Sequence, residues 1–145
     1  MALWDLFRSE CERQLRGVVE PFGFEYAGFQ TKGRGAYCSW LLEPERAAHL
    51  KIWAEYDGST MSYAVLSLER PGRRGLRVTT ASMYIAKFNR ERLADRGELH
   101  VALDARPGQQ EAAVAEIARQ LRIALPHLPA MLAALRERDP DVRMR

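Results

Sequence analysis

Residues 22–68 read FGFEYAGFQTKGRGAYCSWLLEPERAAHLKIWAEYDGSTMSYAVLSL and decide the fold. Apolar and polar side chains alternate in four short runs, at residues 22–27, 36–42, 49–56 and 61–68. Alternation with a period of two is typical of β-strands whose two faces differ. The connections between the runs are short and contain glycine, proline or aspartate, so we predict an antiparallel meander.

The third connection determines which side chains share a face of this sheet. If residues 57–60 form the turn, Ile52 lies opposite Val65 and Tyr56 lies opposite Met61. One face then carries a continuous apolar set, which we expect to receive the helices: Ile52, Tyr56, Tyr63 and Val65.

The second face of the predicted sheet carries four apolar side chains among polar ones: Leu41, Trp53, Leu66 and Leu68. This is more apolar than the wet face of an antiparallel sheet normally is. We therefore expect residues 82–105 or a partner to cover it, and these four side chains are the candidate partner-binding residues. A tryptophan at its middle would suit a binding hot spot.

Amphipathic stretches stand on both sides of the sheet region. Apolar side chains recur at three- and four-residue steps in a first helix that Pro21 ends: Trp4, Phe7, Cys11, Leu15 and Val18. A second helix is predicted from about Gln109, and Pro126 and Pro129 separate it from a short final helix.

The middle of the chain is harder to interpret. Residues 75–81 resemble a fifth strand, residues 88–93 a helical turn, and residues 99–103 a further short strand. We predict a two-layer α+β domain over residues 1–138, with four to five antiparallel strands in a meander. An N-terminal helix and two C-terminal helices pack on one face, and residues 139–145 form a polar tail.

The composition limits the class of protein. Apolar residues make up 47% and charged residues 28% of the 145, which is ordinary for a globular domain. Asp5 and Arg8 interrupt the N-terminal apolar residues, so neither a signal peptide nor a membrane span is predicted there, and we expect a cytoplasmic protein without membrane contact. Cys11 and Cys38 fit buried reduced thiols better than a lone disulfide.

Motifs for chemistry are weak. Residues 28–35 have the glycine spacing of a phosphate loop, but Arg34 and Gly35 replace its lysine and its serine or threonine, and the segment joins two strands. His49, His100 and His127 have no metal-ligand spacing, and His49 is not aligned with Cys38 as a catalytic dyad. The acidic pairs Glu43–Glu45 and Asp139–Asp141 fall in a loop and in the tail. We therefore predict no catalytic, metal or cofactor-binding residues.

One charge cluster stands out in residues 70–77, which read RPGRRGLR. Its four arginines are candidate anion-binding residues: Arg70, Arg73, Arg74 and Arg77. The turn could bind phosphate or an acidic protein surface, or be simply solvated. Meander topology places Lys32 and Arg34 at the opposite end of the sheet, so the two basic turns do not form one stripe.

The order of elements is similar to that of the RWD and ubiquitin-conjugating folds, type III secretion chaperones and small bacterial immunity proteins, but none of their motifs is present. We expect a non-enzymatic bacterial module that binds another protein, as an immunity protein, antitoxin or adaptor does. Alternatives are a basic module that binds nucleic acid or anions through the arginine turn, and an enzyme whose site is assembled from distant residues. A homodimer stays open.

Overall fold

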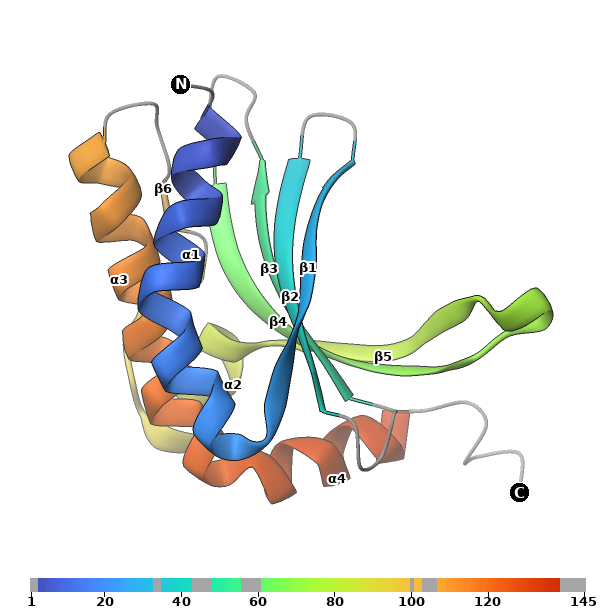
Figure 1. The fold of residues 1–145 in the computed structure, drawn as a ribbon. Helices are drawn as coiled ribbons and strands as arrows, with labels where there is room; N and C mark the ends of the chain where they lie inside the picture. The colour runs from blue at the N-terminus through green and yellow to red at the C-terminus, as the bar shows by residue number, and fades with distance from the viewer. Residues whose placement is uncertain are drawn as a thin grey trace.

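The chain folds into two layers, with helices packed on one face of an antiparallel sheet (Figure 1). The computed structural model describes residues 3–32, 35–42, 48–55, 61–99, 101–102 and 107–138. The predicted α+β fold class is confirmed, including the N-terminal helix and the two C-terminal helices. Those last two helices follow each other almost without a break.

The sheet is the predicted meander. Its strands are β1 (Phe24–Lys32), β2 (Gly35–Leu42), β3 (Ala48–Glu55), β4 (Met61–Pro71) and β5 (Arg77–Tyr84), paired in that order. A two-residue strand, β6 (Val101–Ala102), pairs with Met61 and Ser62 of β4, beyond the end of β5. The fifth strand and the short strand near residue 100 were therefore both visible in the sequence.

Helices fill the other layer. They are α1 (Leu3–Val19), α2 (Ile85–Leu93), α3 (Pro107–Ala124) and α4 (Leu128–Arg138), with short 3₁₀ turns η1 (Glu20–Phe22), η2 (Arg73–Gly75) and η3 (Leu125–His127). The chain leaves α1 through Gly23, whose φ of 94° is left-handed and whose N–H donates to the Glu20 carbonyl at 2.9 Å. Glycine adopts this backbone conformation without the Cβ clash that other residues meet.

The sequence-predicted register was wrong between β3 and β4. Ile52 lies opposite Ala64 rather than Val65, because β3 ends at Glu55 and the connection spans residues 56–60 instead of 57–60. A shift of one residue turns every side chain of a strand to the other face. Between β2 and β3 the alternation predicts Trp40 opposite Ile52, whereas Trp40 lies opposite Leu50. This shift of two residues leaves the side chains of both strands on the predicted faces.

The corrected register changes which side chains form the core. Leu66 and Leu68, predicted on the second face, are fully buried beneath the helices, whereas Tyr63 and Val65 are half-buried on the opposite side. The sheet contributes large side chains to the core, among them Phe24, Trp40, Leu50, Ile52, Leu66 and Leu68. The helices contribute Phe7, Leu15, Ile117 and Leu121 to the same buried cluster. The side chains of Trp4 and Tyr56 lie outside the described residues.

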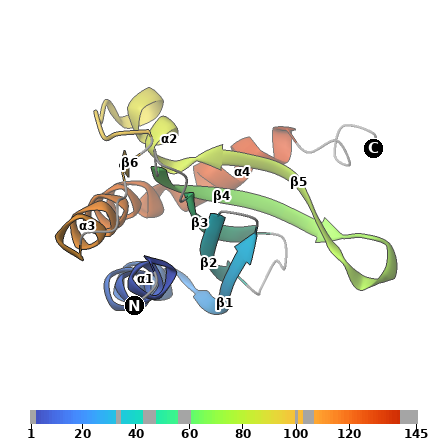
Figure 2. The ribbon, with the colours of Figure 1, turned by 90° about the horizontal axis from the view of Figure 1, so that it is seen from above.

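One predicted alternative, that residues 82–105 fold across the second face, is wrong for residues 82–99 and 101–102, the part of that segment that the structure describes. The helix α2 packs against α3 and β4, and its Ile85 and Phe88 belong to the main buried cluster (Figure 2). Asn89 Nδ2 donates to the Gln120 carbonyl at 2.9 Å, and Gln120 Nε2 donates to the Glu98 carbonyl at 2.9 Å. These two hydrogen bonds hold the segment against α3, on the helix side of the sheet.

Candidate functional site

The β4–β5 hairpin extends beyond the rest of the sheet as a two-stranded arm, which we define as residues 69–79 (Figure 1). The β3–β4 pairing ends at Leu68, so Glu69 and the residues after it in β4 pair with β5. All four sequence-predicted arginines lie on this arm. Arg73 and Arg74 are exposed in η2 at its tip, Arg77 is exposed at the start of β5, and Arg70 is half-buried.

The tip of the arm has a tightly defined backbone. Gly72 donates its N–H to the Leu76 carbonyl, and Leu76 donates to the Arg73 carbonyl at 3.3 Å. A Cβ on Gly72 would lie 2.6 Å from Val78 Cγ2 and 2.9 Å from the Leu76 oxygen, so only glycine fits. Arg74 adopts a left-handed φ of 61°, which is uncommon for a residue with a side chain.

Apolar side chains are exposed on the arm beside these arginines. Leu76 is 68% exposed and Val78 is 51% exposed, the two largest values among the large hydrophobic residues that the structure describes. Val78 lies opposite Arg70 in the hairpin, and Arg77 lies opposite Pro71. The arm therefore presents guanidinium groups and aliphatic surface together.

The second sheet face differs from its predicted composition. Leu66 and Leu68 are removed from it by the register, and Leu41 is half-buried. Trp53 lies opposite Tyr37 and Tyr63 by backbone pairing, but its side chain is outside the described residues. Among the described elements, the helices all lie on the other side of the sheet (Figures 1 and 2).

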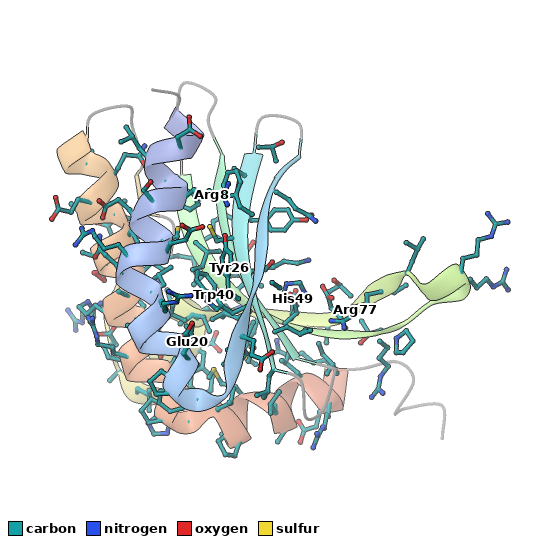
Figure 3. The ribbon with its side chains drawn as sticks, viewed as in Figure 1. Arg8, Glu20, Tyr26, Trp40, His49 and Arg77 are labelled. Carbon is teal, nitrogen blue, oxygen red and sulfur yellow. The ribbon has the colours of Figure 1, made fainter. Side chains whose placement is uncertain are left out.

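A polar cluster around the buried Glu69 occupies this second face where the arm begins, at the position of His49 in Figure 3. Glu69 Oε2 lies 2.9 Å from His49 Nδ1, and Glu69 Oε1 lies 3.4 Å from Lys51 Nζ. Thr79 Oγ1 donates to Glu69 Oε1 at 3.4 Å. Burial alone would raise the pKa of Glu69, but the hydrogen bond and charge of His49, together with Lys51, outweigh it and lower the pKa to about 2.

We expect Glu69 to make the unfolding free energy decrease at low pH. Its pKa is lower in the folded chain than its ordinary value of 4.5, so its contribution is complete above pH 4.5 and is lost as the pH falls toward 2. Between pH 4.5 and pH 2 we expect the wild type to lose about 2 kcal/mol more unfolding free energy than the Glu69→Gln variant loses. Urea unfolding at several pH values measures it, with Glu91→Gln, at an exposed position of α2, as the control. Equal pH dependence in wild type and Glu69→Gln would contradict this role.

A second polar cluster joins α1 to β1 (Figure 3). Tyr26 donates its hydroxyl to Glu12 Oε1 at 2.8 Å, and Arg8 Nε donates to the same oxygen at 3.0 Å. Burial, and then the hydrogen bond to Glu12, raise the pKa of Tyr26. A pocket of about 190 Å³ lies between Glu12, Arg16, Tyr26 and Trp40. The polar groups Arg8, Glu12 and Tyr26 already bond to one another, so we interpret this cluster as a clasp between helix and sheet.

The other sequence candidates do not form a reactive site in the described residues. Cys11 and Cys38 meet in the core as free buried thiols, and burial raises the pKa of Cys11. Cys38 lies on the core face of the sheet and His49 on the other, so they form no dyad. Residues 28–32 of the glycine-rich segment belong to β1 and Gly35 begins β2, so the segment does not open a helix. The pairs at residues 43 and 45 and at 139 and 141, and His100, lie outside the described residues.

No group of three metal-ligating side chains occurs within the described ranges. The same part of the chain contains no helix long and apolar enough to cross a membrane. Comparison with protein-family models, with curated proteins and with solved structures returns no match to this chain.

Proposed function

We propose that this protein is a non-enzymatic binding module of the bacterial cytoplasm that docks on an acidic surface of another protein through the arm. Its manner of action would be that of an immunity protein, antitoxin or adaptor. The observation that carries the proposal is the tip of the arm, where exposed Leu76 and Val78 stand beside Arg73 and Arg74.

This combination suits a protein interface. Arginine is enriched in interfaces and in their hot spots. Apolar side chains that are exposed in the free protein stabilise the complex when a partner covers them. Cross-strand hydrogen bonds between β4 and β5 hold the arm in one shape. A preorganised element loses little conformational entropy on binding.

The backbone of Arg74 supports the proposal independently. A left-handed conformation costs a non-glycine residue about 1 kcal/mol or more, and glycine would adopt it without that penalty. Strained residues cluster at sites where the strain serves a function. Glycine at position 74 would therefore give a more stable arm, which supports a role in binding for the arginine side chain.

Nucleic acid is the competing partner for the same arginines, because a two-stranded ribbon fits the major groove of DNA. Leu76 and Val78 favour a protein, since apolar side chains gain nothing from phosphates. The two partners differ in salt dependence. Binding to nucleic acid weakens steeply with salt, in proportion to the phosphates neutralised.

We expect Arg74→Gly to raise the unfolding free energy by about 0.5–1 kcal/mol and to weaken partner binding about tenfold. A stabilised variant that binds less well separates recognition from folding. The measurements are urea unfolding and capture of the partner from lysate of the native host, identified by mass spectrometry and titrated with salt.

The matched control is Arg122→Ser, which removes one exposed positive charge on α3, compared with Arg74→Ser and with Arg73→Ser/Arg74→Ser. We expect the control to bind as wild type does and the double variant to lose the partner. Equal binding by all variants would show that the arm is only solvated. A captured nucleic acid, with a steep salt slope, would replace the proposed partner class.

A further inference from the structure

The outer edge of the last strand, β5, pairs with no other strand that the structure describes. An edge strand turns unpaired N–H and C=O groups outward, which can pair with an added strand. From Ala81 to Tyr84 the pairing with β4 is regular, so this stretch has the straight geometry that strand addition needs.

Both edge strands carry an irregularity. The register of β5 with β4 shifts between Thr79 and Ala81, and the pairing from Ala81 onward is regular. At the opposite edge, β1 has a bulge between Tyr26 and Gly28, and Gly28 has a φ of 126°. Bulges, charged residues and prolines are the features that protect edges from pairing. The stretch from Ala81 to Tyr84 contains none of these features.

A groove of about 200 Å³ lies beside this edge, lined by residues of β5, α2 and α4. Apolar side chains of three elements line it: Met83 of β5, Phe88 of α2 and Ala134 of α4. Its charged lining consists of three cations and one carboxylate: Lys87, Arg92, Arg138 and Glu91. The groove therefore combines an apolar lining with an excess of positive charge.

We infer that the edge of β5 receives an extended acidic segment of the partner protein, which adds as a strand beside Ala81–Tyr84 and places an apolar side chain in the groove. Main-chain hydrogen bonds would supply affinity, and pockets for alternate side chains would supply specificity. The cations of α2 and α4 select acidic residues in the segment. This inference rests on the proposed function and names the mode of docking, because β5 leads directly from the arm to the groove.

Selection from a displayed library of random twelve-residue peptides tests the inference, with the full chain as bait. We expect the enriched peptides to alternate apolar residues with aspartate or glutamate. Lys87→Glu/Arg92→Glu, which reverses two exposed charges of the groove, should weaken the best peptide about tenfold or more. Enrichment of basic peptides, no enrichment, or equal binding to the charge-reversed variant would overturn the inference.

N-methylation of the selected peptide tests the mode of binding without altering the protein. In an added strand, alternate N–H groups face the edge of the sheet. Methylating one alternate set should therefore abolish binding, and methylating the other set should leave it unchanged. Loss with both sets, or with neither, would exclude strand addition.

The arm variant Arg73→Ser/Arg74→Ser distinguishes this inference from the proposed function. It should bind the selected peptide as wild type does, because Arg73 and Arg74 do not line the groove. If arm variants lose the natural partner but no peptide uses the groove, docking by the arm stands and strand addition fails. If groove variants lose the peptide while arm variants keep the natural partner, the proposed role of the arm fails.

Discussion

Leu66→Asp should unfold the protein, whereas Val65→Asp at the neighbouring position should leave it folded. Leu66 is fully buried and pairs with Leu50 and Met83, two other core residues. Val65 is half-buried on the second face, opposite Lys51 and Tyr84. An unpaired buried carboxylate costs several kcal/mol, which is comparable with a total stability of about 5–15 kcal/mol.

Circular dichroism and thermal unfolding of the two variants measure this difference. Leu66→Met is the control, since a swap that conserves volume usually costs less than about 1.5 kcal/mol. A folded Leu66→Asp together with an unfolded Val65→Asp would restore the register predicted from a turn at residues 57–60.

The sequence predicted the sheet but not the faces of β4, and the composition of that strand explains why. Residues 61–68 read MSYAVLSL, with Tyr63 and Val65 on one side and Leu66 and Leu68 on the other. Both sides are apolar, so alternation alone does not say which side is buried. The length of one turn decides it, and that length depends on tertiary packing as well as on local residues.

The segment after β5 was only partly legible for a different reason. Its helix α2 is short, and hydrogen bonds to distant residues fix its place, as between Asn89 and Gln120. Arg119 Nη1 likewise lies 3.0 Å from Asp95 Oδ1, across 24 positions of the sequence. Contacts of this kind leave no periodic signal, whereas the long regular pattern of α3 does.

In the candidate site, too, the sequence reveals residues that are neighbours along the chain but not those that strand pairing brings together. The arginines of the arm are contiguous, so the sequence identified them as a group. The cluster of His49, Lys51 and Glu69 forms only in the correct register, so no spacing rule finds it. The exposure of Leu76 and Val78 was missed because their alternation with polar residues predicts a strand. A strand at the end of a sheet need not bury either face.

Phe7→Ala should destabilise the protein by about 3–5 kcal/mol. Phe7 is fully buried in α1, which packs against α3 and β2, as the prediction of a helix facing the sheet required. Ile52 belongs to the same buried cluster as Phe7. Tyr63 and Val65, which we predicted on the same sheet face as Ile52, lie on the other face. Removing the ring leaves a cavity between three elements that cannot collapse together, so the cost exceeds the simple transfer free energy.

Ser9→Ala, two residues further along α1, provides the matched control for Phe7→Ala. Ser9 is exposed, and alanine has the higher helix propensity, so we expect a change within about 0.5 kcal/mol. Urea unfolding of the two variants at one pH gives both values. A small effect of Phe7→Ala would mean that α1 contributes little to the core, and that the buried faces of α3 and the sheet hold each other without it. The clasp of Arg8, Glu12 and Tyr26 would then be the main attachment of α1 to the sheet, because it does not depend on the ring.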